Sequence, residues 1–169
     1  LNGLQKPIEP LNAVNSGTTA RLLTGLLSKQ KFESTLEGSA QLSKRPMERI
    51  IKPLCENGAK INDNNGKLPL FFTPSEYTFE HINSSKPSAQ VKSGLLLASL
   101  YHESFQTTIT EETPTRDHTE RMLSLMGVNL VRLGNSVTVE PKSKLQNIDY
   151  NVPGDPSSAA FLIAIGVLR

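Results

Sequence analysis

A short polar opening leads into an apolar run in the segment Asn15-Ser-Gly-Thr-Thr-Ala-Arg-Leu-Leu-Thr-Gly-Leu-Leu27. Serine, threonine and asparagine are frequent N-caps of helices, because their side-chain oxygens accept hydrogen bonds from the free backbone N–H groups of the first turn. The apolar residues that follow are typical of a helix that packs into a core. The segment therefore predicts a capped, largely buried helix.

The same pattern occurs twice more in the chain. It recurs in Ser88-Ala-Gln-Val-Lys-Ser-Gly-Leu-Leu-Leu-Ala-Ser-Leu100 and in Gly154-Asp-Pro-Ser-Ser-Ala-Ala-Phe-Leu-Ile-Ala-Ile165. Alignment on Asn15, Ser88 and Gly154 gives spacings of 73 and 66 residues, which are longer than the repeats of solenoid proteins. We interpret the pattern as a degenerate internal repeat of stacked supersecondary units.

Two further helices are predicted between the repeats. Residues 46–56 are amphipathic, with Pro46 at the first helical position and Gly58 at the end. Another helix opens at Asp117, and Glu120 lies three residues later, as in a capping box. Strands are expected at residues 32–36, 59–62, 68–73, 77–82, 107–110, 128–133 and 136–139, the last two joined as a hairpin by Gly134-Asn135. Each unit then reads β-α-β-α-β-β, which gives an α+β fold.

Composition excludes several classes of protein. The chain has 169 residues, the size of one domain by the usual prior of about 100–200 residues. A net charge of +2 and the absence of Trp argue against a nucleic-acid surface. No apolar run is long enough to cross a bilayer. The single cysteine, Cys55, excludes an internal disulfide and fits a reducing compartment, so we expect a cytoplasmic protein.

The polar openings of the helices are candidate anion sites. Gly17 and its hydroxyl neighbours leave backbone N–H groups free at the positive end of a helix dipole, and Arg21 adds a charge one turn later. Ser88-Ala-Gln90 repeats this arrangement. Arg45 is held by the stiff Pro46 backbone, and its guanidinium suits carboxylate or phosphate. Taken singly, each feature is equally well explained by an ordinary helix cap or a solvated arginine, but two related helix starts close together predict a site for anionic ligands.

The segment Thr115-Arg-Asp-His-Thr-Glu120 gives mixed signals. Arg116 stands at another helix start and is a second candidate for phosphate binding. Asp117 and Glu120 are explained by helix capping, and a lone histidine such as His118 is more often a surface or cap residue than a ligand. We expect no metal site, since no His/Cys cluster has ligand spacing, and His81 and His102 are expected to be exposed.

Five motifs follow one another over nearly the whole chain. They are Asn15-Ser-Gly-Thr-Thr-Ala-Arg21, Lys44-Arg-Pro-Met47, Ser88-Ala-Gln-Val-Lys-Ser93, Arg116-Asp-His-Thr-Glu-Arg-Met-Leu123 and Val152-Pro-Gly-Asp-Pro-Ser-Ser-Ala-Ala160. Together they closely resemble the 5-enolpyruvylshikimate-3-phosphate synthase family. The resemblance implies two domains of three β-α-β-α-β-β units each. Residues 1–151 would form about two of the three units of the N-terminal substrate-binding domain, and residues 152–169 the crossover and first helix of the second.

The resemblance also implies a reaction. The 5-hydroxyl of shikimate 3-phosphate attacks C2 of phosphoenolpyruvate while C3 is protonated, and the resulting ketal loses phosphate without a metal or organic cofactor. The residues that would bind phosphoenolpyruvate are Asn15, Gly17, Thr18, Arg21, Arg45 and Gln90. Those that would bind shikimate 3-phosphate are Ser88, Ala89, Gln90, Thr115 and Arg116.

Other family properties extend beyond this chain. The family's Lys-Ser-x-x-x-Arg segment would precede Leu1 and its proton-transfer residues would follow Arg169, so we expect an internal fragment that contains no catalytic residue and does not turn over. Gly17 is the residue type of glyphosate-sensitive members, which implies competition between glyphosate and phosphoenolpyruvate in the parent enzyme. Full-length members are usually monomers, and neither nucleic acid nor membrane is an expected partner.

Two alternatives stay open. Many sister enzymes that act on UDP-N-acetylglucosamine use a loop cysteine before the Arg-Pro pair, whereas residues 38–46 contain none and Cys55 lies on the next helix, where we expect it to pack in the core. The other alternative is a non-catalytic RNA-binding module with a basic cluster at Lys44, Arg45, Arg49 and Lys52. No aromatic side chains alternate with these basic residues, which argues against that module.

Overall fold

The computed structural model describes residues 3–84, 86–142 and 144–167, which form two successive β-α-β-α-β-β units and a final helix. The first unit consists of β1 (Leu11–Asn12), α1 (Gly17–Leu27), β2 (Ser34–Glu37), the short 3-10 helix η1 (Leu42–Lys44), α2 (Glu48–Glu56), β3 (Lys60–Asn62) and β4 (Leu70–Thr73). The second consists of β5 (His81–Ser84), α3 (Ala89–Ser99), β6 (Thr107–Glu111), α4 (His118–Leu125), β7 (Leu130–Leu133) and β8 (Ser136–Val139). Helix α5 (Pro156–Val167) follows. The predicted α+β fold class and the unit pattern are confirmed.

The two units share one sheet topology. Their strand orders are β1-β2-β4-β3 and β5-β6-β8-β7, and in each sheet the first pair is parallel and the other two pairs are antiparallel. The internal repeat is therefore structural, but its alignment shifts by one residue. The N-caps of α1 and α3 are Ser16 and Ser88, so Ser16 rather than Asn15 is the counterpart of Ser88.

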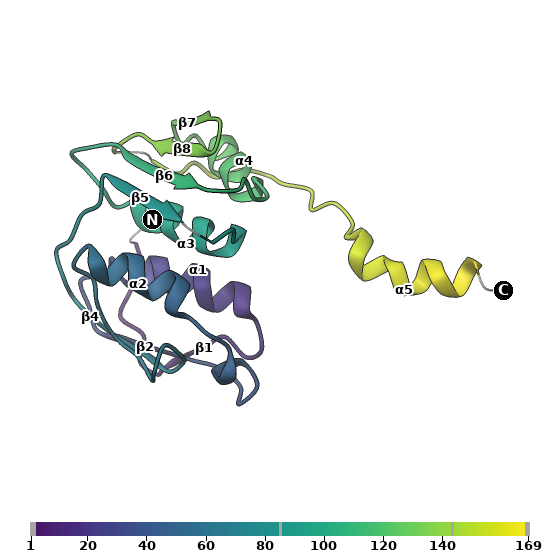
Figure 1. Ribbon diagram of the computed structural model, residues 1–169, viewed down its shortest axis with the longest axis horizontal. Helices are drawn as coiled ribbons and strands as arrows, with labels where there is room; N and C mark the ends of the chain where they lie inside the picture. The colour runs from purple at the N-terminus through teal and green to yellow at the C-terminus, as the bar shows by residue number, and fades with distance from the viewer. Residues whose placement is uncertain (1–2, 85, 143, 168–169) are drawn as a thin grey trace.

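The two sheets lie on the outside and enclose α1, α2 and α3 between them (Figure 1). Strand side chains alternate between the core and solvent, as the pleat requires: Leu70 and Phe72 are buried, whereas Phe71 and Thr73 are exposed. Buried residues from both units, such as Leu36, Leu95 and Ile109, belong to one continuous hydrophobic core. The core therefore fixes the two units against each other.

Helices α1 and α3 approach each other at two glycines. A Cβ atom built on Gly25 would lie 1.9 Å from the carbonyl oxygen of Gly94, and one on Gly94 would lie 2.7 Å from the carbonyl oxygen of Arg21. Only glycine permits backbones to come this close. Because the helices are in contact here, one turn after Arg21, their N-terminal turns lie side by side.

Several predicted element boundaries differ from the structure, most of them by one or two residues, and two of the differences have an evident cause. Helix α2 begins at Glu48, two residues after Pro46, because the Met47 N–H bonds to the Gly66 carbonyl at 2.7 Å and holds the chain outside the helix. The strand expected at residues 77–82 begins only at His81, whose partner is Thr108. Tyr77 and Phe79 are buried in the core although they precede β5. Their alternation with polar residues is therefore explained by core packing and not by pairing with another strand.

The prediction that His102 is exposed is wrong, because its exposed fraction is 4%. The ring packs edge-to-face against Phe79 with centroids 4.7 Å apart, and Nδ1 lies 2.7 Å from Thr107 Oγ1. Burial, and then the charge of Lys29, lower the pKa of His102 to about 4. His81 is exposed, as expected.

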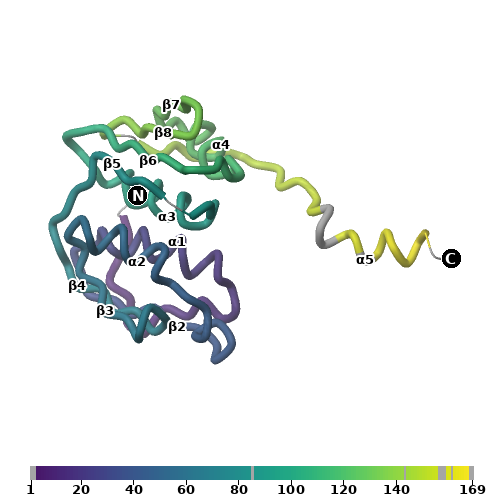
Figure 2. The backbone as a smooth tube through the Cα atoms, in the orientation of Figure 1, coloured from purple at the N-terminus to yellow at the C-terminus, as the bar shows by residue number. Residues whose placement is uncertain are grey.

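Helix α5, which the third repeat predicts, projects away from the two units (Figure 2). Its exposed apolar side chains include Leu162, Ile163, Ile165 and Val167. Over residues 3–84, 86–142 and 144–167, no helix is both long enough and apolar enough to span a bilayer.

Candidate functional site

The start of α1 is an open helix terminus. Ser16 is its N-cap, and the Ser16 Oγ accepts hydrogen bonds from the Thr19 N–H at 3.1 Å and the Thr19 hydroxyl at 2.8 Å. Gly17 is the first helical residue, and Thr18 is exposed beside it. The helix dipole makes this turn favourable for an anion.

Arg21 ties this turn to two neighbouring segments. Its Nη1 donates to the Gly17 carbonyl at 3.2 Å and to Gln90 Oε1 at 2.9 Å, and its Nη2 donates to the Pro46 carbonyl at 3.0 Å. The Gln90 amide in turn donates to Thr18 Oγ1 at 2.7 Å. Gln90 thus joins the starts of α1 and α3, as the pseudo-symmetry of the two units predicts.

Positive charge accumulates around Gly17. Burial lowers the pKa of Arg21, and the charges of Arg45 and Arg49 lower it further, which indicates three guanidinium groups close together. Within the described ranges of the chain, none of the three is ion-paired to a carboxylate. A Cβ atom on Gly17 would lie 2.9 Å from Arg21 Nη1 and 3.4 Å from Arg45 Nη1, so both arginines reach over this glycine. An anion would relieve their mutual repulsion.

Asn15 lies two residues before Gly17, and its side chain is already engaged with other parts of the chain. Its amide donates to Gln41 Oε1 at 3.1 Å and its oxygen accepts from the Ser39 hydroxyl at 3.1 Å. Asn15 therefore connects the start of α1 to the loop that leads into η1. Arg45 follows η1 directly and is exposed.

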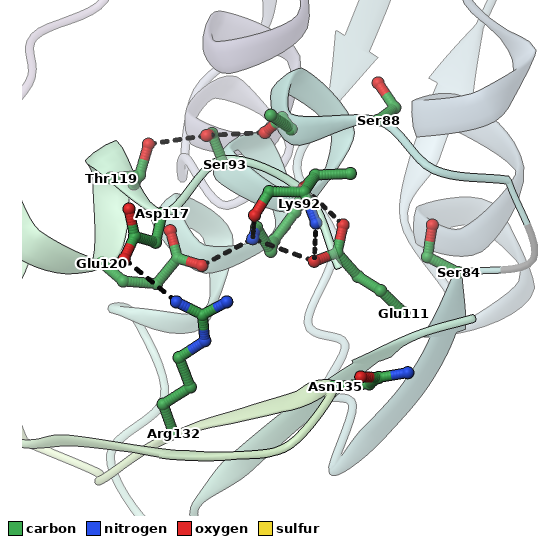
Figure 3. Close-up of polar contacts among 12 residues, drawn as sticks. Ser84, Ser88, Lys92, Ser93, Glu111, Asp117, Thr119, Glu120, Arg132 and Asn135 are labelled. Carbon is green, nitrogen blue, oxygen red and sulfur yellow. Dashed lines mark hydrogen bonds and ion pairs between the residues drawn. The ribbon is translucent and has the colours of Figure 1, made fainter. Parts of the chain in front are cut away.

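The start of α3 is built in the same way and faces α4. Ser88 is the N-cap and accepts from the Val91 N–H at 3.4 Å. The Ser93 hydroxyl bonds to the Ala89 carbonyl at 2.7 Å and pairs with Thr119 Oγ1 at 2.6 Å (Figure 3). These contacts place the first turns of α3 and α4 next to each other.

Thr115 and Arg116 lie on the loop between β6 and α4, beside the start of α3. The Thr115 hydroxyl donates to Glu111 Oε1 at 2.6 Å, and the Thr115 carbonyl accepts from Lys92 Nζ at 3.4 Å. Arg116 is exposed and, in the part of the chain that the structure describes, forms no hydrogen bond or ion pair. The start of α3 and the loop of Thr115 and Arg116 therefore lie next to each other, as the residues expected to bind one ligand must.

The predicted capping box at α4 is wrong. Asp117 occupies the N-cap position, but its side chain makes no cap hydrogen bond and instead pairs with Arg132 Nη1 at 3.0 Å. Glu120 is buried, and its Oε1 lies 2.6 Å from Lys92 Nζ. A buried ammonium group attracts a carboxylate more strongly than a partly exposed backbone N–H does, which explains the choice of partner.

Lys92 and Glu111 are the residues that the sequence analysis misses. Lys92 is the one charged residue of α3, whose other residues are mostly apolar or small, and a lysine that is buried on such a helix requires a buried anion. Glu111 lies two positions after Ile109 on β6 and so shares its inward face. A lone lysine on a buried helix and a glutamate on the inward face of a strand together could have indicated the Lys92–Glu111 ion pair. No group of three or more His, Cys, Asp or Glu side chains that could hold a metal is found within residues 3–84, 86–142 and 144–167.

Comparison with known proteins identifies the family. The family model described as EPSP synthase (3-phosphoshikimate 1-carboxyvinyltransferase) matches residues 2–169. The chain is 49% identical to the 3-phosphoshikimate 1-carboxyvinyltransferase of Endomicrobium trichonymphae, covering 92% of this chain and 36% of the relative. With the same enzyme of Limosilactobacillus fermentum the identity is 44%, covering 98% of this chain and 39% of the relative. The chain thus spans between a third and two fifths of the length of these relatives.

A solved structure of EPSP synthase from Acinetobacter baumannii has the same fold, with a TM-score of 0.87 and 46% sequence identity over 95% of this chain and 37% of that chain. These matches favour the shikimate branch over the UDP-N-acetylglucosamine enzymes and over an RNA-binding module. The half-buried Cys55 packs against the core from α2, as expected, which also separates this chain from the sister enzymes with a loop cysteine. This chain belongs to the EPSP synthase family.

Proposed function

We propose that the protein to which this chain belongs transfers the enolpyruvyl group of phosphoenolpyruvate to the 5-hydroxyl of shikimate 3-phosphate and releases phosphate. In this proposal the chain supplies binding residues for both substrates. The observation that supports it best is the Arg21–Gln90–Thr18 hydrogen-bond network, which joins two helix starts next to arginines that have no carboxylate partner among the described residues. Such an arrangement suits two anions that bind side by side.

The phosphoenolpyruvate subsite is proposed at the start of α1. Arg45 and Arg21 supply positive charge, and the missing side chain of Gly17 lets both guanidinium groups come close to the first turn of α1. Thr18 and Gln90 offer hydrogen bonds at its border, and Asn15 holds the adjoining loop. Charge that develops on the departing phosphate is stabilised here by fixed donors.

The shikimate 3-phosphate subsite is proposed at the start of α3. Ser88, Ala89 and Gln90 form its first turn, where backbone N–H groups point outward. Thr115 and Arg116 approach from the loop before α4, and the free guanidinium of Arg116 suits the 3-phosphate.

The remaining expectations for this chain are also proposals. Residues 1–151 contribute to a substrate-binding domain and residues 152–169 lead into a second domain. The general acid and base come from elsewhere in the enzyme, so this chain alone binds without turnover. The enzyme acts in the cytoplasm as a monomer, on small-molecule substrates, with no metal, organic cofactor, nucleic acid or membrane.

Calorimetric titration of the chain with shikimate 3-phosphate tests the binding proposal. Arg116→Ala removes the free guanidinium, and the loss of a charged hydrogen bond of about 1.5–3 kcal/mol weakens the affinity by at least tenfold. Arg121→Ala is the matched control, because Arg121 is also exposed and lies on α4 itself. Equal affinities for the two variants would contradict the assignment of Arg116.

A chimera tests the reaction. The chain replaces the matching segment of the Acinetobacter baumannii EPSP synthase, and phosphate release is followed with both substrates. We expect turnover by the chimera and none by the isolated chain. A chimera that folds and binds neither substrate would overturn the proposed function.

A further inference from the structure

A buried ionic cluster of Lys92, Glu111 and Glu120 lies behind the proposed shikimate 3-phosphate subsite. None of these three residues is among those assigned to the subsite. Lys92 of α3 is 2% exposed, and its Nζ lies 2.9 Å from Glu111 Oε2 of β6 and 2.6 Å from Glu120 Oε1 of α4. Figure 3 shows the three side chains converging from their separate elements. The cluster therefore joins all three elements that surround the loop of Arg116.

Folding alone does not account for this cluster. One ammonium group is buried with two carboxylates, and Glu120 Oε2 has no hydrogen-bond partner within the described residues. Burial of charged groups opposes folding, and apolar residues of similar size often stabilise a core at least as well. A role in fixing a specific backbone conformation explains why charged groups occupy this position.

That backbone is the peptide segment at Thr115. Glu111 accepts the Thr115 N–H at 3.2 Å and the Thr115 hydroxyl proton at 2.6 Å, while Lys92 donates to the Thr115 carbonyl at 3.4 Å. All three polar groups of Thr115 are thus bound by the cluster. Burial raises the pKa of Glu111, but the hydrogen bonds from Thr115 and Lys92 outweigh burial and lower it overall, so the carboxylate stays an acceptor.

The other side of Arg116 is held as well. Asp117 Oδ2 lies 3.0 Å from Arg132 Nη1, which reaches across from β7 (Figure 3). Arg116 therefore stands between two residues whose positions are fixed, while its own guanidinium is exposed and forms no hydrogen bond or ion pair with the described residues. An anchor held at its base and free at its tip loses little conformational freedom when it binds.

We propose that Lys92, Glu111 and Glu120, together with the Asp117–Arg132 pair, are positioning residues that hold Arg116 ready for the phosphate of the substrate. The inference rests on the proposed function only in that the phosphate is taken to belong to shikimate 3-phosphate. The cluster acts through the backbone of residues 115–117 and does not touch the ligand. Ordering of this loop is therefore measurable without any ligand.

Two variants release the loop from opposite sides. Glu111→Gln keeps the size of the side chain but leaves it uncharged and with a single acceptor oxygen, so it cannot accept from Lys92, the Thr115 N–H and the Thr115 hydroxyl together. Arg132→Ala frees Asp117 by removing a pair whose side chains are 41% and 38% exposed, so the fold is expected to tolerate it. Lys52→Ala is the matched control, because it removes the exposed Lys52–Glu56 pair on α2, which lies in the other unit.

Hydrogen exchange of the ligand-free chain measures the ordering itself. We expect the Thr115 amide to exchange about tenfold faster or more in Glu111→Gln, with the amides of α1 unchanged. Lys52→Ala leaves the Thr115 exchange rate as it is. An unchanged Thr115 exchange rate in Glu111→Gln overturns the proposal, whatever the chain binds.

Titration with shikimate 3-phosphate then separates positioning from stability. Glu111→Gln and Arg132→Ala are each expected to weaken affinity about fivefold to tenfold, and in Arg132→Ala the melting temperature stays unchanged. In an Arg116→Ala background both substitutions have no further effect, because the group that they position is absent. If each substitution instead weakens the affinity by the same factor with and without Arg116, the cluster acts independently of Arg116 and the inference is overturned. If Arg116→Ala itself binds as tightly as the unaltered chain, the assignment of Arg116 to the phosphate subsite fails, and the inference fails with it; the proposed function is tested separately by the chimera.

Discussion

Two arginine side chains reach over Gly17, and we expect the absence of a side chain there to matter for the proposed binding of phosphoenolpyruvate. An added methyl group would lie 2.9 Å from Arg21 Nη1 and 3.4 Å from Arg45 Nη1. Both atoms are the far ends of flexible side chains, so they move at little cost to the fold. The same movement disturbs the basic group that is proposed to face phosphoenolpyruvate.

Gly17→Ala is therefore expected to separate stability from binding. The melting temperature changes little, or rises, because alanine favours the helix. Affinity for phosphoenolpyruvate falls about tenfold, which is about 1.4 kcal/mol of binding free energy and close to the loss of one charged hydrogen bond. Parallel thermal melts and titrations with phosphoenolpyruvate check this, and affinity for shikimate 3-phosphate serves as the internal control. Unaltered phosphoenolpyruvate affinity would place that ligand away from Gly17.

His102 makes folding sensitive to acid. Thr107 Oγ1 donates its proton to the Phe79 carbonyl at 3.1 Å, so His102 Nδ1 must be the donor in their hydrogen bond, and the buried Nε2 carries the lone pair. The folded-state pKa is about 4, whereas an unfolded histidine titrates at about 6.5. The folded state thus favours the neutral ring, and the unfolded state takes up a proton first as the pH falls.

Stability contributed by the neutral His102 is fully present above about pH 6.5 and is lost as the pH falls through 6.5 towards 4, up to about 3 kcal/mol. Urea unfolding at pH 7, 5.5 and 4.5 measures this loss. His102→Asn retains a donor near Nδ1 but does not titrate, so it is expected to be less stable at pH 7 and to lose less on acidification. If the free energy of unfolding falls equally in both proteins between pH 7 and pH 4.5, the loss is due to carboxylates and not to His102.

At the scale of elements, the contact between α1 and α3 aligns the two proposed subsites. A Cβ atom on Gly25 would come within 1.9 Å of a backbone oxygen, which cannot rotate away as a side chain can. Gly25→Ala must therefore push the helices apart. It would also separate Arg21 from Gln90, whose hydrogen bond spans the same interface.

We expect Gly25→Ala to lower the free energy of unfolding by about 3 kcal/mol or more, at or above the upper end of overpacking penalties. Urea denaturation measures the loss. Gly166→Ala is the control, because Gly166 on α5 has no neighbouring atoms within 4 Å of an added Cβ. Equal stabilities of the two variants would show that α1 and α3 can separate without loss.

Local patterns predict most of these elements, because caps, turn residues and apolar periodicity act over a few neighbouring residues. The hairpin at Gly134, where φ is +56°, and the start of α3 at Ser88 are examples. Errors arise where a distant partner decides. Asp117 and Glu120 look like caps until Arg132 and Lys92 are brought beside them by β7 and α3. His102 is likewise buried by Phe79, which lies far away in the sequence.

At the scale of the whole molecule, the two units form one packed body, and α5 lies apart from it with exposed apolar side chains. The units share one core and two joined helix starts, whereas α5 projects from them (Figure 1). Leu162 is 73% exposed and Val167 is 79% exposed, and adjacent apolar side chains on α5 extend this surface. Contiguous exposed apolar surface of this kind is typical of a segment that packs against another protein surface.

Removal of residues 152–169 is expected to leave the melting temperature of the two units unchanged, because none of the α5 residues whose burial the structure describes belongs to their core. The unaltered chain is expected to self-associate as its concentration rises, and the shortened chain to stay monomeric, as measured by light scattering during gel filtration. Replacement of Leu162 and Ile165 by glutamate in the full chain should reproduce the shortened chain's behaviour, because it removes apolar surface without removing the helix. If the unaltered chain stays monomeric over the same concentration range, the apolar surface of α5 does not drive association. If the shortened chain melts at a lower temperature, α5 instead contributes to the stability of the two units.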